Sequence, residues 1–272
     1  MFCHKVTIEM EKEDDIFYLR PLGDIHIGNL GCDLNKFQKS IDLIKKRDDY
    51  FTIGMGDYID NVQAYANGGI DKRWNPETVN RQTLTTEEQT DKFLEMWSPI
   101  KDKTFGLLAG NHEWKTINQR RFVKDFCNPL GVPYLGRLAY VHVSFVKKMP
   151  GKTNRKTIRK YLILALHGGY SGMQAGGSMN RMKAICGDFD CDLVLMGHNH
   201  DTVTRPIVRM GYDELTNSPI EKKVLLGNTG TFLRGYEKGV DSYVEINPKE
   251  AKRVGTITVT FSPKDGDIFG HD

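Results

Sequence analysis

The chain of 272 residues is long enough for one large α/β core, and we expect a single domain over residues 1–272. Hydrophobic residues make up 39% and charged residues 27%, values that are ordinary for a folded protein and exclude the disordered and fibrous classes. The formal charge of +3 is too small to indicate nucleic-acid binding by itself, so any basic surface must be local.

The cysteines and the apolar segments indicate the cellular compartment of the protein and whether it enters a membrane. The five cysteines are odd in number and include no CxxC pair, so we expect neither a disulfide framework nor a zinc finger. The N-terminus lacks a signal-peptide pattern, and no run approaches the roughly 18 apolar residues of a membrane span. We therefore expect a cytoplasmic protein with no membrane partner, in which Cys186 and Cys191 are core thiols.

The first predicted elements alternate between strands and helices. Residues 16–22 form an apolar run that predicts a buried strand, and apolar residues at helical spacing over 34–44, behind a capping Asp33, predict a helix. Residues 50–53 predict a second strand. Residues 61–85 have no clear periodicity and contain Gly, Pro and Asn, so we expect an irregular insertion there.

The middle of the chain continues the alternation and then changes to a hairpin. A helix is predicted near residues 87–97 and a strand over 105–109. Strands near 138–146 and 158–166 are predicted to pair, joined by the polar, basic loop 147–160. The charges of this loop favour a solvated turn over a nucleic-acid patch.

The last part of the chain is predicted to be rich in strands. Residues 193–196 predict a short buried strand. After residue 201 there are few helical patterns, and we expect the following runs to form the second sheet of a sandwich. These runs are 203–208, 224–226, 242–246 and 256–261.

Each of five predicted strands is followed by a short polar segment. The segments are GDIHIG, GDYID, GNHE, LHGG and GHNH, beginning at residues 23, 56, 110, 166 and 197. Ligands gather at the carboxyl ends of strands in α/β sheets, so these segments are predicted to converge on one cleft. Glycines 23, 56, 110 and 197 come directly before polar residues, where the backbone must turn sharply out of a strand.

The residue types in these segments fit the hydrolysis of a phosphate ester. That reaction needs a nucleophilic hydroxide at neutral pH and neutralisation of the phosphate charge, and two divalent ions about 3.5–4 Å apart supply both. About seven nitrogen and oxygen ligands hold such a pair, with one carboxylate shared by the two ions. The segments contain a set of this size and kind.

The order and spacing of the five segments resemble those of the calcineurin-like metallophosphoesterases. The resemblance implies an α/β fold, a four-layer α/β/β/α sandwich, and hydrolysis by in-line attack of a metal-bridging hydroxide. It implies two divalent ions, Mn²⁺, Fe or Zn²⁺ with Mn²⁺ favoured. The implied ligands are Asp24, His26 and His200 for one ion, Asn111, His167 and His198 for the other, and Asp57 as the bridge.

Further residues receive roles beside the implied ligands. By the same resemblance His112 contacts the phosphate and assists the leaving group, and Glu113 orients His112 by accepting its second N–H. Asp60 is open between a partner of a ligand and a simple loop turn. Arg181 and Arg234 are candidates for substrate-phosphate contacts. The aromatic candidates for stacking on a base are Tyr58, Tyr65 and Trp74.

The substrate stays open within the class of phosphate esters. The strand-end site with its long insertion favours a phosphodiesterase, first a nuclease and second an enzyme acting on a small-molecule phosphodiester, so nucleic acid or nucleotide is the expected partner. The alternatives are a phosphomonoesterase or phosphoprotein phosphatase, and a catalytically silent metal-binding scaffold. No motif residue is missing, which disfavours the scaffold. The sequence does not indicate an oligomeric state.

Overall fold

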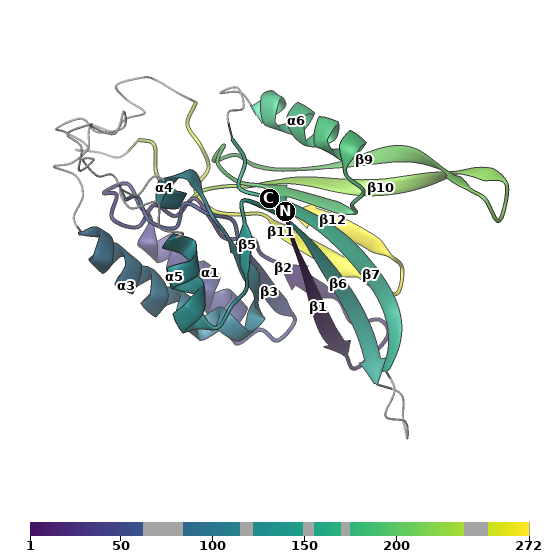
Figure 1. Ribbon diagram of the computed structural model, residues 1–272, viewed down its shortest axis with the longest axis horizontal. Helices are drawn as coiled ribbons and strands as arrows, with labels where there is room; N and C mark the ends of the chain where they lie inside the picture. The colour runs from purple at the N-terminus through teal and green to yellow at the C-terminus, as the bar shows by residue number, and fades with distance from the viewer. Residues whose placement is uncertain (62–83, 115–121, 149–154, 170–174, 237–249, 272) are drawn as a thin grey trace.

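Two facing sheets with helices on both outer sides form the protein (Figure 1). The computed structural model describes residues 1–61, 84–114, 122–148, 155–169, 175–236 and 250–271. The segments predicted as the insertion and as the strand 242–246 therefore lie wholly or largely outside the described residues. Within the described residues, no helix has the length and apolar character needed to cross a membrane.

The first sheet has six strands in the order β1-β6-β7-β8-β10-β9. Its strands are β1 Phe2–Met10, β6 Leu138–Lys148, β7 Arg155–Leu166, β8 Leu193–Met196, β9 Thr202–Asp213 and β10 Ser218–Thr229. The predicted hairpin is present as β6 and β7, which pair antiparallel. Its strands run farther than predicted, because residues 147–148 and 155–160 of the predicted basic loop pair as strand.

The second sheet also has six strands, in the order β12-β11-β2-β3-β4-β5. Its strands are β2 Phe17–Leu19, β3 Tyr50–Gly54, β4 Thr104–Leu108, β5 Tyr134–Gly136, β11 Thr258–Ser262 and β12 Asp267–His271. The prediction that the strands after residue 201 build one separate sheet is wrong. β9 and β10 extend the first sheet, whereas β11 and β12 extend the second, because local apolar patterns predict a strand but not its partner.

The helices close the sandwich on both sides. They are α1 Leu34–Lys46, α3 Thr86–Trp97, the 3₁₀ turn η1 Ser98–Lys103, the single turn α4 Asn111–Trp114, α5 Phe122–Leu130 and α6 Ala175–Asp188. Local signals explain where two of them begin. Asp33 accepts a hydrogen bond from Lys36 N at 2.9 Å to cap α1, and Thr85 forms a capping box with Glu88 before α3.

Three hydrophobic cores separate the layers. The core between the two sheets includes Phe145 and Phe261, whose rings lie 5.8 Å apart. A second core, with Trp97 in it, lies between the second sheet and α1, α3 and α5. The third core lies between the first sheet and α6 and contains Cys186 and Cys191, which are therefore core thiols as predicted. Four layers in this order confirm the predicted α/β/β/α sandwich.

Candidate metal centre

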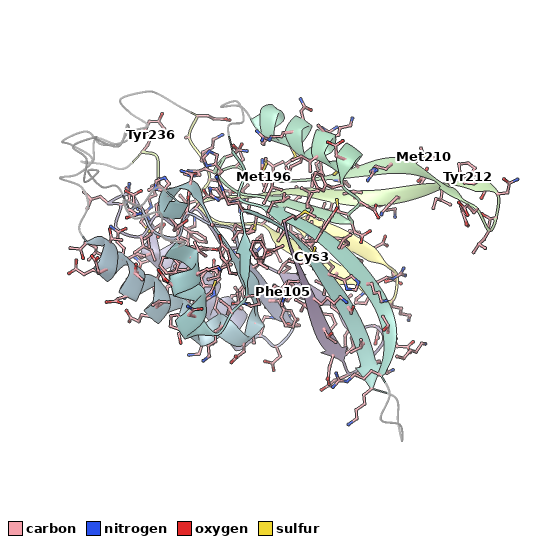
Figure 2. The ribbon with its side chains drawn as sticks, in the orientation of Figure 1. Cys3, Phe105, Met196, Met210, Tyr212 and Tyr236 are labelled. Atoms are coloured by element: carbon pink, nitrogen blue, oxygen red, sulfur yellow. The ribbon has the colours of Figure 1, made fainter. Side chains whose placement is uncertain are left out.

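The five polar segments meet where strands of both sheets end. Asp24, Asp57 and Asn111 follow β2, β3 and β4 of the second sheet, while His167 and His198 follow β7 and β8 of the first. Met196 marks the end of β8 in Figure 2. A hydrogen bond joins the two sheets here, because the backbone N–H of His198 donates to Asp24 Oδ2 at 2.9 Å. The convergence predicted from the sequence therefore takes place between two sheets.

One group of side chains consists of Asp24, His26 and His200. Their ligand atoms all lie within 4.8 Å of one another. The Nε2 atoms of His26 and His200 are 3.3 Å apart, and His200 Nε2 is 3.3 Å from Asp24 Oδ1. Asp24 is fully buried, and among the described residues its Oδ1 has no hydrogen-bond donor in good geometry. A buried carboxylate oxygen without a donor, facing two imidazoles, fits a cation.

A second group consists of Asp57, His167 and His198, with Asn111 beside it. His167 Nδ1 lies 2.7 Å from the Met55 carbonyl, so this nitrogen carries the proton. The lone pair of His167 Nε2 then faces Asp57 Oδ2 at 3.2 Å and Asn111 Oδ1 at 3.1 Å. A ring nitrogen this close to two oxygen acceptors is stable only when it carries a proton or when the atoms share a cation.

The charges of the centre follow from burial and from the opposing residues. Burial lowers the pKa of His167, but Asp57 and Asp24 raise it more, to about 10. Burial raises the pKa of Asp57, but His167 and His112 lower it well below its usual range. The ionised carboxylates and the protonated histidines thus balance each other, and a bound cation would replace the protons as the positive charge.

Five residues of the centre have left-handed backbone conformations. The φ angles are 47° at Asp24, 56° at His26, 52° at Asp57, 70° at His198 and 61° at His200. A residue with a side chain costs about 1–2 kcal/mol in this region, and such residues cluster where function requires their geometry. All five residues belong to the two groups of possible metal ligands, so the left-handed backbone occurs where those groups are built.

Close backbone approach explains the glycine before Asn111. A Cβ added to Gly110 would lie 2.0 Å from Asp57 Oδ1 and 2.2 Å from Asp57 N. The backbone of Gly56 has a φ of 91°, so only this residue of the two needs the left-handed conformation. The sequence predicted that both glycines allow a sharp backbone turn. This reason holds at Gly56, whereas at Gly110 a glycine is needed because any side chain would collide with Asp57.

His112 lies at the edge of the centre and is partly exposed, with 13% of its side chain accessible. Its Nδ1 is 2.5 Å from the Asp60 carbonyl oxygen, and its backbone N–H donates to Asp57 Oδ1 at 2.9 Å. Its Nε2 lies 3.9 Å from Asp57 Oδ2. The ring is thus held by one nitrogen and presents the other to the centre.

The predicted role of Glu113, to orient His112, is wrong. Glu113 is 1% exposed, and its carboxylate accepts backbone N–H groups from Gly110, Asp57, Tyr58 and Ile59. Both oxygens are therefore occupied by backbone, and burial followed by Asp57 raises the pKa of Glu113 to about 7. Glu113 joins the loop after β3 to the loop after β4, which carry two of the polar segments.

The sequence left Asp60 open between a partner of a metal ligand and a simple loop turn, and in the structure it contacts the ligand candidate His26. It is 3% exposed, its Oδ1 lies 3.2 Å from His26 Nδ1, and its Oδ2 accepts from Asn29 Nδ2 at 3.3 Å. A carboxylate on one imidazole nitrogen directs the lone pair of the other nitrogen toward the Asp24 group. The Met55 carbonyl does the same for His167, and no sequence signal could have shown it, because the contact is made by backbone.

The candidate substrate contacts Arg181 and Arg234 stay predictions, and the structure describes one of the three aromatic candidates. Arg234 forms an ion pair with Asp33, at 2.7 Å, at the cap of α1. Arg181 is exposed on α6. Tyr58 is fully buried and donates to the Leu108 carbonyl at 2.8 Å, which excludes it from stacking on a base. Tyr65 and Trp74 lie outside the described residues.

Comparison with known proteins identifies the family. The model of the calcineurin-like phosphoesterases matches residues 22–202, about two thirds of the chain, including all five polar segments. A search of curated proteins found no match. Similar solved structures include a metallophosphoesterase from Sphaerobacter thermophilus, with 13% identity, a TM-score of 0.39, and coverage of 94% of this chain and 87% of that one.

Two further similar structures have comparable scores. Vacuolar Protein Sorting 29 from Cryptosporidium parvum is 14% identical with a TM-score of 0.38, covering 94% of this chain and 96% of that one. A predicted phosphoesterase from Streptococcus pneumoniae TIGR4 is 10% identical with a TM-score of 0.36, covering 94% and 99%. These TM-scores are too low to support an argument. The family match and the side chains gathered at the strand ends agree, and the chain belongs to the calcineurin-like phosphoesterase family of metal-dependent phosphoester hydrolases.

Proposed function

We propose that the protein hydrolyses phosphate esters at a centre that binds two divalent metal ions. The observation that carries this proposal is the pair of adjacent side-chain groups, one around Asp24 and one around Asp57, in which imidazole nitrogens lie 3.1–3.3 Å from carboxylate and amide oxygens, as the ligands of a bound ion do. The backbone bond from His198 to Asp24 and the left-handed segments hold the two groups together. A single-ion site would need only one of them.

The donor set suits the ions expected from the sequence. Imidazole nitrogens, carboxylate oxygens and one amide oxygen fit Mn²⁺, Fe or Zn²⁺, with Mn²⁺ as our first choice. When bound, two such ions would neutralise the phosphate oxygens and make a water nucleophilic at neutral pH, in line with the leaving group. Asp24, His26 and His200 would hold one ion, Asn111, His167 and His198 the other, and Asp57 would contact both.

The protein's own groups prepare the centre for the reaction. Asp60 and the Met55 carbonyl each accept from one ring nitrogen of a ligand histidine, which leaves the second nitrogen free to bind a metal. His112 is partly exposed and anchored through Nδ1, so its Nε2 can reach a substrate oxygen and hydrogen-bond the phosphate or protonate the leaving oxygen. We assign His112 as the catalytic residue on this ground.

A phosphodiester is the substrate that we propose, with nucleic acid or a nucleotide as its source. The support lies at the two ends of the predicted insertion. Asn61, where it begins, donates from Nδ2 to the His112 carbonyl at 3.0 Å, and Thr86, just after it, donates to Asn61 Oδ1 at 3.0 Å. The residues that flank the insertion in sequence thus bond to the His112 backbone and to each other, and a long insertion next to a site favours an ester with two substituents.

Hydrolysis of a substrate panel tests this proposal. The panel contains aryl phosphate mono- and diesters, cyclic nucleotides, single-stranded and duplex DNA, and RNA, each with added Mn²⁺ and with metal content measured in parallel. We expect two bound ions per chain and higher kcat/KM for diesters than for monoesters. Faster monoester turnover would favour a phosphomonoesterase or phosphoprotein phosphatase, and two ions without turnover of any ester would favour a silent scaffold.

We also propose that the chain forms a single domain and that the protein is cytoplasmic. The single domain is supported by the order of the strands, because the chain passes twice from the first sheet to the second: β1 and β6–β10 lie in the first, and β2–β5, β11 and β12 in the second. Limited proteolysis that released a stable folded half would contradict it. Cytoplasmic localisation is supported by the absence of described disulfides among the five cysteines, and cell fractionation would test it.

A further inference from the structure

The hairpin of β9 and β10 extends away from the rest of the protein (Figure 1). Three apolar side chains that alternate along β9 are exposed there, with accessible fractions of 55% for Val208, 66% for Met210 and 62% for Tyr212. Met210 and Tyr212 are labelled on this projecting hairpin in Figure 2. Alternating residues of a strand share one face, so Val208, Met210 and Tyr212 form an apolar row on one face of the hairpin.

β9 is also an edge strand. It is the last strand of the first sheet, and among the described residues it pairs only with β10. Gly230 N donates to the Asp201 carbonyl at 2.8 Å, and the register continues without a shift from this pair along β9. Odd-numbered residues therefore bond to β10, and the N–H and C=O groups of Val208, Met210 and Tyr212 face the open side.

The protection of this edge stops halfway along the strand. Pro206 also falls on the open side, where a residue without an N–H is tolerated, and it blocks pairing near the body of the protein. Beyond it, residues 207–213 contain no proline, lysine or bulge, the usual devices against pairing. Arg209 is turned back and donates to the Phe189 carbonyl at 3.4 Å. This part of the edge, about 23 Å long, combines open backbone groups with the apolar row and is therefore a surface for another strand.

We propose that this edge pairs antiparallel with the same edge of a second copy, forming a two-fold dimer centred on Met210. The sequence of the strand is self-complementary about that residue. With Met210 opposite Met210 of the copy, Val208 lies opposite Tyr212 in both directions, so apolar side chains pair with apolar ones. Arg209 lies opposite Gly211, whose lack of a side chain leaves room, and no like charges are directly opposed.

The size of the contact sets the expected strength. The outward groups of the three residues in each copy form about six backbone hydrogen bonds, since each pair of facing residues exchanges two. Together with the apolar row, the pairing buries on the order of 1,000 Å² in total, at the lower limit of specific interfaces. We therefore expect a dimer that dissociates in the micromolar range. Met210, the centre of the proposed pairing, lies about 33 Å along the chain from His200, so the pairing does not cover the metal centre.

Sedimentation of the full-length chain from low micromolar to about 100 µM tests the dimer. We expect a monomer–dimer equilibrium that M210K weakens at least about tenfold, because the two introduced lysines would face each other. L215K is the matched control, since Leu215 is 97% exposed at the hairpin turn but outside the paired residues. Unchanged far-UV circular dichroism and aryl phosphate hydrolysis would show that each variant is folded. A wild-type monomer at the highest concentration, or a dimer that M210K leaves intact, would overturn the proposal.

Charge pairs test the register separately. V208K and Y212E should each weaken self-association, whereas a mixture of the two should form a mixed dimer, because the new lysine faces the new glutamate. Chains of different mass, one fused to a small tag, make the mixed dimer measurable. A mixture that associates no better than the two variants alone would refute pairing about Met210.

Discussion

The buried carboxylate of Glu113 offers the sharpest test of the structural reasoning. In E113Q one carboxylate oxygen becomes an NH₂ group that cannot accept hydrogen bonds. Whichever oxygen is replaced, two backbone donors lose their acceptor, either those of Tyr58 and Ile59 or those of Asp57 and Gly110. An unpaired buried donor costs about 1–3 kcal/mol, so we expect a loss of about 2–4 kcal/mol after partial relaxation.

That loss is a large part of the roughly 5–15 kcal/mol that stabilises a typical domain. Urea denaturation of the metal-free protein, followed by tryptophan fluorescence, to which the buried Trp97 contributes, measures it. The matched control is E95Q, because the Glu95 side chain is 70% exposed and, among the described residues, forms an ion pair with Lys92 alone. We expect a change below about 0.5 kcal/mol. The two variants make the same chemical change in opposite environments.

Kinetics separate this role of Glu113 from the orienting role expected from the sequence. If Glu113 joins the two loops, E113Q lowers metal affinity, and saturating Mn²⁺ restores most of kcat. If Glu113 orients His112, kcat falls at saturating metal while the free energy of unfolding stays near that of the wild type. The second result would refute our interpretation of the hydrogen bonds.

Three other substitutions test separate parts of the structure. H112A should keep both metal ions and lose about 10²–10⁴-fold in kcat, measured together with metal content; loss of metal with retained turnover would contradict the assignment. D57N should release metal and abolish activity, because its carboxylate belongs to the buried ligand set; two tightly held ions in this variant would exclude Asp57 as a ligand. D33A should cost about 1–2 kcal/mol in urea denaturation through the lost cap of α1 and the lost pair with Arg234. Burial raises the pKa of Asp33, but the Lys36 N–H and Arg234 lower it more, to below its usual value, so this contribution is present above about pH 4. It should vanish as the pH falls through the lower folded-state pKa, and a constant difference between wild type and D33A down to pH 2 would contradict this account.

Local patterns in the sequence were sufficient for the elements that depend on neighbouring residues. Asp33 predicted the start of α1, and its side chain caps that helix in the structure. Short apolar runs predicted β3, β4, β7 and β8, because such runs between turn residues are typical of buried strands. The order of the polar segments after those strands was enough to name the side chains that gather at the centre, as family members share that order.

Contacts between residues far apart in the chain were decided only by the tertiary structure. His198 and Asp24 are hydrogen-bonded across 174 positions, and the partners of β9 and β11 in different sheets follow from such long-range pairing. Glu113 stands next to His112 in sequence, yet three of the four backbone groups that its carboxylate binds are more than 50 positions away. Sequence neighbours and residue types thus determined which groups the protein carries. Packing determined which of them face each other, because burial, left-handed backbone and shared hydrogen bonds depend on the whole fold.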